Sequence, residues 1–343
     1  MKRGRMIYSV LSLMIFALIL IGCNGKKKDN REESEVSFFP VTESSESILP
    51  ERSFSDDVGF DSKSILPEGA PSDDAGFEED TFGLIDPDGT TLESRIRTPE
   101  GYMRTEAEEG SLAEYLRTYE LKPDQSPVLL YDGTPKGNQD SHVAVFTLPI
   151  EEEDLQQCAD SVMRVYAEYY WEKGEYDKIR FHFVNGFLAE YEKWREGWRI
   201  KVNGSEVSWS KSASFDDSYG CFQSFMRIVF SYAGTLSMAA ECGGISLADA
   251  APGDVFLKGG SPGHVVMIVD ACVDGSGRKA FLLAQGYMPA QEFHVLKNIL
   301  HEEDPWYYED EITYPFVTPE YTFEEGSLCR PEQIEAQEGG KRG

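Results

Sequence analysis

Apolar residues recur at helical spacing in three stretches of the chain. Ser111 and Glu114 form a capping-box pattern ahead of a short apolar stripe, which predicts a helix over 111–119. Segment 151–173 begins with acidic residues and continues with a stripe that includes Cys158, so it predicts a long helix with Cys158 in the core. Segment 216–240 has a second long stripe.

Strict alternation of apolar and polar residues marks the strands. Segments 179–183, 198–202 and 207–209 alternate and are separated by Asn185-Gly186 and Asn203-Gly204, which are strong hairpin signals. Shorter apolar runs predict further strands at 128–131, 142–148, 254–257, 264–270, 280–285 and 293–297. Together these patterns predict an α+β fold with a mainly antiparallel sheet and two longer helices.

The N-terminus has the layout of an export signal. Three basic residues precede an apolar run over 6–21, which is short for a membrane-spanning helix. The run ends in Leu20-Ile21-Gly22-Cys23 and resembles a bacterial lipobox, which implies a signal peptide over 1–22 and lipidation at Cys23. The alternative is an ordinary signal peptide with an incidental cysteine. We therefore expect a lipid-anchored protein of the bacterial cell envelope, on the outer membrane if the cell is Gram-negative.

Charge divides the rest of the chain. The 343 residues have a formal net charge of −29, which disfavours nucleic acid as a partner. Residues 24–94 contain 19 acidic and 6 basic side chains without apolar periodicity, so we expect residues 23–94 to form a lipidated, disordered acidic tether. A single domain over 95–330 and a disordered tail over 331–343 would follow. The tether repeats Ser-Ile-Leu-Pro-Glu at 47–51 and 64–68, either as a linker duplication or as a weak docking motif.

Three residues in the second half of the chain suggest nucleophilic chemistry. Cys221 lies in the first turn of the second long helix if Ser218 is its N-cap, where free backbone N–H groups favour a thiolate. His264 opens an apolar strand after a Gly/Pro turn, and Gln285 lies near the end of the next strand. A thiol, an imidazole base and a polar group that orients the base form an activated-nucleophile arrangement.

The segments Pro252-Gly253-Asp254-Val255-Phe256 and Pro262-Gly263-His264-Val265-Val266 resemble the papain-like cell-wall amidases and peptidases of the NlpC and CHAP types. This resemblance covers about residues 216–286. It implies a papain-like core, with Cys221 as nucleophile, His264 as base and Gln285 as the orienting residue. The sequence around Cys221 departs from the Asp-Cys-Ser-Gly-like run of those families and is about one residue out of helical phase.

A longer resemblance extends over about residues 95–306, to a family of Bacteroides-type lipoproteins known only as a domain of unknown function. The segments that carry it are Arg97-Thr98-Pro99-Glu100-Gly101-Tyr102, Leu129-Leu130-Tyr131-Asp132-Gly133, Lys136-Gly137-Asn138-Gln139, Asp154-Leu155-Gln156-Gln157-Cys158-Ala159-Asp160, Arg199-Ile200-Lys201-Val202-Asn203-Gly204 and Gly260-Ser261-Pro262-Gly263-His264. The resemblance implies an envelope lipoprotein and supplies no activity.

Other side chains add less. His142 also opens an apolar strand after a polar turn, so it either faces a cleft shared with His264 or repeats the pattern by chance. The histidines lack close metal-ligand spacing, so we expect no metal and no cofactor. Five cysteines remain besides Cys23, and their pairing is open.

Two main hypotheses of function follow. The domain is a papain-like thiol amidase or peptidase that acts on cell-wall or other peptides, or it is a non-catalytic relative that binds a peptide or glycan in the same cleft. A structural surface protein that acts through its tether is a third class. Enzymatic activity therefore stays undecided at the level of sequence.

Overall fold

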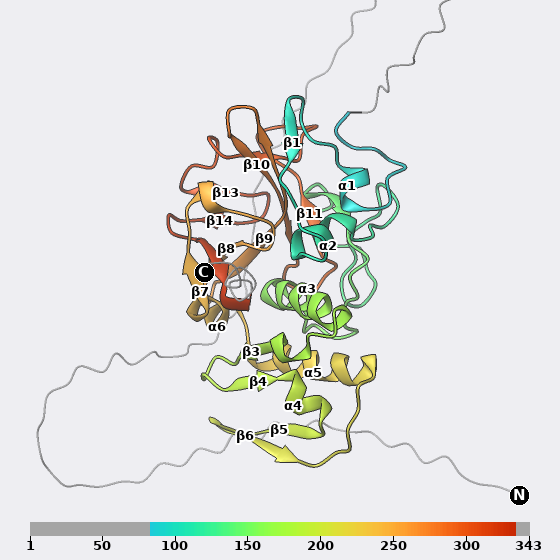
Figure 1. Cartoon of the computed structure of the whole chain (residues 1–343), viewed down its shortest axis with the longest axis vertical. Coiled ribbons are helices and arrows are strands. Elements are labelled where there is room, and N and C mark those ends of the chain that lie inside the picture. The colour runs from blue at the N-terminus through green and yellow to red at the C-terminus, as the bar shows by residue number, and fades with distance from the viewer. Residues whose placement is uncertain (1–82, 334–343) are drawn as a thin grey trace, which may run out of the picture. The chain divides into compact units, whose positions relative to one another are not determined.

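A computed structural model describes residues 83–333 of the chain (Figure 1). The signal peptide, Cys23, most of the predicted tether and most of the predicted tail lie outside these residues. The described chain is a mixed α+β structure around a large antiparallel sheet, which confirms the predicted fold class.

Nine strands form the large sheet. Its main path runs β2-β11-β10-β9-β8-β15-β7, while β1 pairs with β9 and β12 with β10, and every pairing is antiparallel. The strands are β1 (Tyr102–Arg104), β2 (His142–Val145), β7 (Cys242–Gly244), β8 (Val255–Lys258), β9 (His264–Asp274), β10 (Lys279–Gln285), β11 (His294–Leu296), β12 (Tyr307–Tyr308) and β15 (Leu328–Pro331).

Two cores lie on the two faces of this sheet. Val265, Met267 and Val269 of β9 pack into one core with α3 (Cys158–Glu172), the longest helix of the described chain. Val266 and Ile268 point to the other face, which the hairpin of β13 (Phe316–Val317) and β14 (Thr322–Phe323) covers. Because side chains alternate along a strand, consecutive residues of β9 serve different cores.

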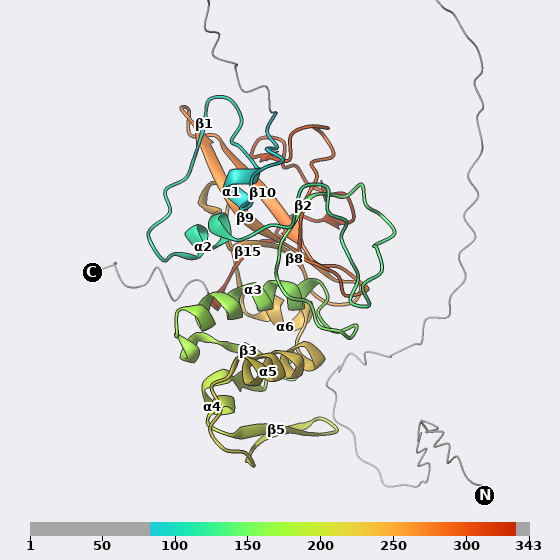
Figure 2. The ribbon, with the colours of Figure 1, turned by 90° about the vertical axis from the view of Figure 1, so that its right-hand side faces the viewer.

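A smaller layer packs against the far side of α3. Figure 2 shows α3 between the large sheet and this layer. It contains the hairpins β3 (Arg180–His182) with β4 (Leu188–Glu190) and β5 (Trp198–Asn203) with β6 (Glu206–Lys211), and the helices α4 (Tyr191–Arg195) and α5 (Tyr219–Tyr232). Both hairpins turn at the predicted Asn-Gly pairs, where Gly186 and Gly204 have positive φ.

The remaining helices are short. They are α1 (Leu92–Arg95), α2 (Leu112–Thr118), α6 (Thr235–Ala240) and the 3₁₀ turns Tyr176–Lys178 and Leu247–Asp249. Helix α2 begins at the predicted N-cap, since Ser111 Oγ accepts a hydrogen bond from Glu114 N–H. No helix within residues 83–333 has both the length and the apolar character needed to cross a membrane.

Four local predictions differ from the structure. The first long helix starts at Cys158 rather than at 151, and the second is divided into α5 and α6 by an extended break at Ala233 and Gly234. The predicted strand 128–131 makes only isolated bridges. Residues 84–94 pack on the domain instead of belonging to the tether, because Leu92 is fully buried and Ile85 pairs with Ile96.

Buried polar links join the layers. Arg164 of α3 is fully buried and donates to Glu168 (2.6 Å), Glu151 (3.2 Å) and the Tyr219 hydroxyl (2.9 Å) of α5. A disulfide connects Cys242 of β7 with Cys329 of β15, and the described chain leaves Cys158, Cys221 and Cys272 as free, buried thiols.

Candidate functional site

His264 and Gln285 meet on neighbouring strands. His264 is the first residue of β9 and Gln285 is the last residue of β10, and these strands pair antiparallel. The Nε2 atom of His264 lies 2.6 Å from Oε1 of Gln285, and both side chains are buried. The structure thus brings together two of the three residues that the sequence pattern selects.

The surroundings of Gln285 determine which way its amide points. Gln285 Nε2 lies 2.7 Å from a carboxylate oxygen of Glu320 and 3.5 Å from Nε2 of His294. The Nδ1 of His294 faces the Glu292 carbonyl at 2.9 Å and must donate to it, so Nε2 of the neutral ring is an acceptor. Burial lowers the pKa of His294 well below its ordinary value, which keeps that ring neutral. Both acceptors require the amide nitrogen on their side.

This orientation fixes the tautomer of His264. Since Gln285 presents its Oε1 to the ring, His264 Nε2 must carry the proton and Nδ1 holds the lone pair. Nδ1 is buried and has no hydrogen-bond partner in the described chain. Burial also lowers the pKa of His264 to about 4, so the lone pair is free at neutral pH.

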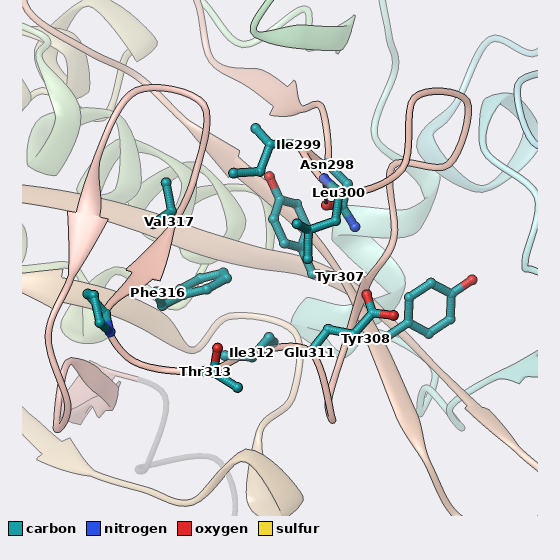
Figure 3. A pocket seen from close by; sticks show the side chains of 11 residues that line it. Asn298, Ile299, Leu300, Tyr307, Tyr308, Glu311, Ile312, Thr313, Phe316 and Val317 are labelled. Atoms are coloured by element: carbon teal, nitrogen blue, oxygen red, sulfur yellow. Dashed lines mark hydrogen bonds between the residues drawn. The ribbon is translucent and has the colours of Figure 1, made fainter.

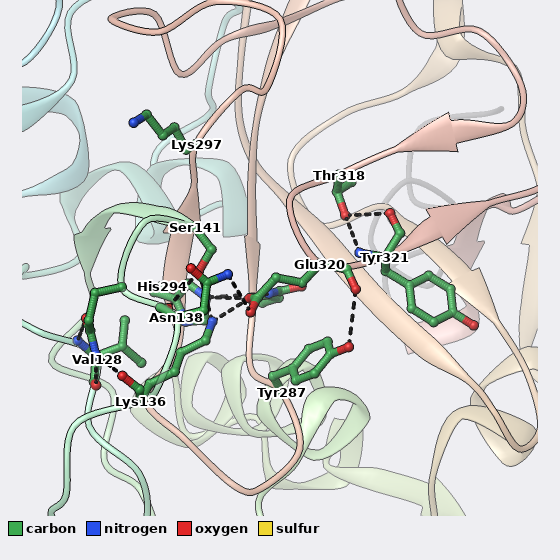
Figure 4. Close-up of polar contacts among 12 residues, drawn as sticks. Val128, Lys136, Asn138, Ser141, Tyr287, His294, Lys297, Thr318, Glu320 and Tyr321 are labelled. Atoms are coloured by element: carbon green, nitrogen blue, oxygen red, sulfur yellow. Dashed lines mark hydrogen bonds and ion pairs between the residues drawn. The ribbon is translucent and has the colours of Figure 1, made fainter. Parts of the chain in front are cut away.

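A lysine balances the charge of Glu320. Figure 4 shows Glu320, on the turn between β13 and β14, close to Lys136 and Asn138. The Lys136 ammonium pairs with Glu320 and donates to Ser141 Oγ (2.9 Å), and its side chain is only 6 % exposed. The buried carboxylate that orients Gln285 is thereby compensated by a buried cation.

Aromatic rings enclose His264. The rings of Tyr287 and Tyr321 lie 4.9 Å from the imidazole, and Phe323 stacks on it at 6.1 Å. Tyr287 is held in place by donating its hydroxyl to the Glu320 carbonyl (3.2 Å). The enclosure excludes water from the ring and accounts for its low pKa.

Cys221 lies in a different environment. Its N–H donates to Ser218 Oγ (3.2 Å), which confirms Ser218 as the N-cap of α5. Its thiol interacts with Trp194 of α4, and burial raises its pKa. None of the groups that perturb this thiol is among those that surround His264. The helical phase turns Cys221 toward α4, so the structure does not place the predicted nucleophile with the predicted base.

Cys158 is the thiol that lies beside the His264 strand. It is the first residue of α3, and its sulfur interacts with the backbone N–H groups of Ala159 and Val265, the residue after His264. It also acts electrostatically on Tyr287 and Tyr321, the two rings that contact His264. Burial raises the pKa of Cys158 to about 11, against the smaller opposing effect of these N–H groups. The thiol is therefore neutral at rest, next to N–H donors that would stabilise negative charge on sulfur.

Two glycines leave room for close packing at these strand ends. A Cβ atom on Gly286, directly after Gln285, would lie 2.2 Å from Ser161 Oγ of α3. A Cβ atom on Gly263, directly before His264, would lie 2.3 Å from the Gly260 carbonyl. The absence of a side chain at Gly286 lets the first turn of α3 pack against the end of β10, and its absence at Gly263 lets the turn before β9 close tightly next to Thr235 of α6.

A pocket of about 450 Å³ opens beside Cys158. The first turn of α3 lines one wall, and the Gly260–Gly263 turn before β9 lines another, with α6 and Met288 between them. Cys158 lines this pocket, although its side chain is only 5 % exposed.

Comparison with known protein families gives one match. Residues 92–330, more than half of the chain, match the family described as Domain of unknown function (4846). The chain belongs to this family. No curated protein and no solved structure matches the chain. The family supplies no activity, so the function of this DUF4846 domain rests on its own residues.

His142 lies at the margin of the site in this DUF4846 domain. Its ring is 5.9 Å from that of His294, and its Nε2 lies 3.1 Å from the Ser126 carbonyl. It lines a separate pocket with Gln139 and Val143. The structure thus connects His142 to the polar network through His294 and gives it a different opening from that of Cys158.

A further pocket of about 220 Å³ lies on the opposite side of the sheet from α3 (Figure 3). Ile299, Leu300 and Val317 are exposed at it, and Tyr307 and Phe316 line its interior. No cysteine and no histidine is among the residues that line this pocket, so the lining offers no group for thiol chemistry. Within residues 83–333, no group of His, Cys, Asp or Glu side chains is arranged to hold a metal ion.

The sequence pattern gives no site role to two residues, Cys158 and Glu320. The pattern predicts Cys158 in the core, because the acidic residues at 151–154 fit a first helical turn. The available signal was Asp160, whose carboxylate accepts from Gln157 N–H (3.1 Å) and so marks a helix start at Cys158. Glu320 had no local signal, since it reaches Gln285 only through the fold.

Proposed function

We propose that this domain is a papain-like thiol hydrolase in which Cys158, not Cys221, is the nucleophile. The observation that carries the proposal is the His264–Gln285 pair, whose lone-pair nitrogen, His264 Nδ1, is buried without a partner at the start of β9. Cys158 lies on the α3 side of the same strand end, where its sulfur contacts the Val265 N–H and acts on Tyr287 and Tyr321, the two rings beside His264. A thiol, a tautomer-fixed imidazole and an orienting amide are the parts needed for acyl transfer.

Each group has a role in the proposed reaction. The Cys158 sulfur attacks the carbonyl carbon of an amide while His264 Nδ1 takes the thiol proton. The carbon–nitrogen bond breaks, and the imidazolium returns that proton to the departing amine. Water then attacks the thioester, with His264 again as base, and releases the acid and the free thiol. Because both groups are neutral at rest, proton transfer accompanies attack.

The predicted lipid anchor at Cys23 suggests where the substrate lies. We propose that the domain acts at the bacterial cell envelope, on stem peptides of the cell wall or on other peptides. A non-catalytic relative that binds a peptide or glycan in the same pocket is the second candidate. The burial of the Cys158 thiol, which raises its pKa, favours that candidate.

Acylation by p-nitrophenyl acetate separates the two candidates. We expect the full-length protein to release p-nitrophenolate in a burst and to acquire one acetyl group, which peptide mass spectrometry assigns to Cys158. Cys158→Ala should abolish the burst, whereas Cys221→Ala and Cys272→Ala should retain it. Absence of any adduct at Cys158 would support the non-catalytic candidate, and an adduct at Cys221 would contradict the proposed nucleophile.

The pH dependence of this burst tests the base. His264 accepts a proton only while its Nδ1 is unprotonated, and burial lowers its pKa to about 4. The rate of acylation should therefore persist below pH 6 and fall only as the pH drops through about 4. A decline centred near 6.5, the ordinary value for histidine, would contradict a buried imidazole as the base.

A further inference from the structure

We propose that Asp160 binds a protonated amine of the substrate, so that the domain acts on acyl groups with a free ammonium close to the scissile carbonyl. This proposal deepens the proposed hydrolase function and rests on it, because the bound amine belongs to a substrate only if Cys158 is the nucleophile. The amine site itself depends only on the pocket beside Cys158.

The carboxylate of Asp160 has an unused hydrogen-bonding capacity. Asp160 is the third residue of α3, two positions after Cys158, and is only 7 % exposed. Its Oδ2 accepts from Gln157 N–H (3.1 Å), while its Oδ1 is buried without a partner. A buried carboxylate oxygen without a donor costs stability, so its presence beside a candidate nucleophile points to a ligand that supplies the donor.

The charge of the pocket selects the kind of donor. Asp154 and Asp160 both line it, and no lysine, arginine or histidine is among its lining residues. One Asp154 oxygen already accepts from Ala290 N–H (2.7 Å) and from Gln157 Nε2 (3.1 Å). Two carboxyl groups without a neighbouring cation favour a positively charged ligand. A primary ammonium has three N–H donors, one of which can bond to the unpartnered Oδ1 of Asp160.

Amine binding would also act on the thiol. The charge of Asp160 raises the pKa of Cys158, although burial is the larger cause. Burial likewise raises the pKa of Asp160, to about 8, so the carboxyl group of the empty site is largely protonated at neutral pH, and an ammonium binds and favours its ionised form. An ammonium bound to Asp160 offsets its charge and removes this part of the effect on sulfur. The correct substrate would thereby favour the thiolate that attacks it.

Charge-selective labelling of the full-length protein tests the site. The thiol of Cys158 displaces methanesulfinate from 2-aminoethyl methanethiosulfonate, a cation, or from its 2-sulfonatoethyl analogue, an anion, and forms a mixed disulfide in either case. At about pH 8.5, above the pKa of Asp160, we expect the cation to label Cys158 at least about tenfold faster, and Asp160→Asn to reduce that ratio by about tenfold. Asp140→Asn, an exposed carboxylate outside the pocket, is the control and should leave the ratio unchanged.

A protection experiment distinguishes this proposal from the hydrolase. L-alanine amide should slow labelling of Cys158 by uncharged methyl methanethiosulfonate, and N-acetyl-L-alanine amide should not. Protection that disappears in Asp160→Asn supports the amine site even if p-nitrophenyl acetate fails to acylate Cys158. Equal effects of the two amides, or an unchanged labelling ratio in Asp160→Asn, would overturn the amine site while leaving the hydrolase test intact.

Discussion

Replacing Asp270 by asparagine is expected to lower the free energy of unfolding by about 3–5 kcal/mol. Asp270 of β9 is fully buried and accepts from Arg104 Nε and Arg117 Nε, both at 2.7 Å. Arg117 also donates to the Thr105 carbonyl (2.7 Å), so this cluster fastens α2 and β1 to the central strand. Asparagine keeps the shape but removes the charge and offers an N–H to guanidinium donors.

Urea unfolding followed by tryptophan fluorescence measures this effect. Asp140→Asn is the matched control, because Asp140 is exposed and its loss should change the free energy by no more than about 0.5 kcal/mol. A loss of less than 1 kcal/mol for Asp270→Asn would mean that the two arginines find other partners or reach water.

Replacing Gln285 by leucine is expected to slow the acylation of Cys158 by about 10²- to 10⁴-fold, the usual contribution of a positioned general base. Leucine has a similar size but provides no acceptor for His264 Nε2–H, and it leaves Glu320 and His294 without the amide donor. The proton of His264 is then free to occupy Nδ1, where it blocks the base.

The p-nitrophenolate burst reports this rate, and circular dichroism checks the fold. Gln291→Leu serves as a control, since Gln291 is equally buried but its side-chain nitrogen makes no hydrogen bond. A Gln285→Leu protein with wild-type acylation would show that His264 needs no orienting residue, and would remove the main support for the proposed mechanism.

Features that depend on neighbouring residues along the chain are the ones that the sequence predicts correctly. The β5–β6 hairpin follows from alternation around an Asn-Gly turn, and the strands from β8 to β10 follow from continuous apolar runs separated by short turns. The capping role of Ser218 was also local. The break between α5 and α6 was missed because the apolar stripe continues across Ala233 and Gly234.

Cys158 is the residue whose position the local pattern predicts least well. The four acidic residues at 151–154 fit a first helical turn, and this pattern predicts Cys158 in the interior of the helix. In the structure residues 151–157 are not helical. Glu151 accepts a hydrogen bond from Arg164, and Asp154 accepts one from Ala290 N–H. These are tertiary contacts, and they shift the start of α3 to the residue whose thiol contacts the His264 strand.

The sequence by itself determined that His264 and Gln285 lie on two consecutive strands, because apolar runs and the short turns between them depend on neighbours along the chain. It also selected these two residues as partners. Only the tertiary structure decided that Glu320 and His294 orient Gln285, that Cys158 rather than Cys221 contacts the strand of His264, and that Asp160 lines the adjoining pocket. Those contacts join residues up to 107 positions apart, and their geometry arises from how α3 packs on the sheet rather than from any local pattern.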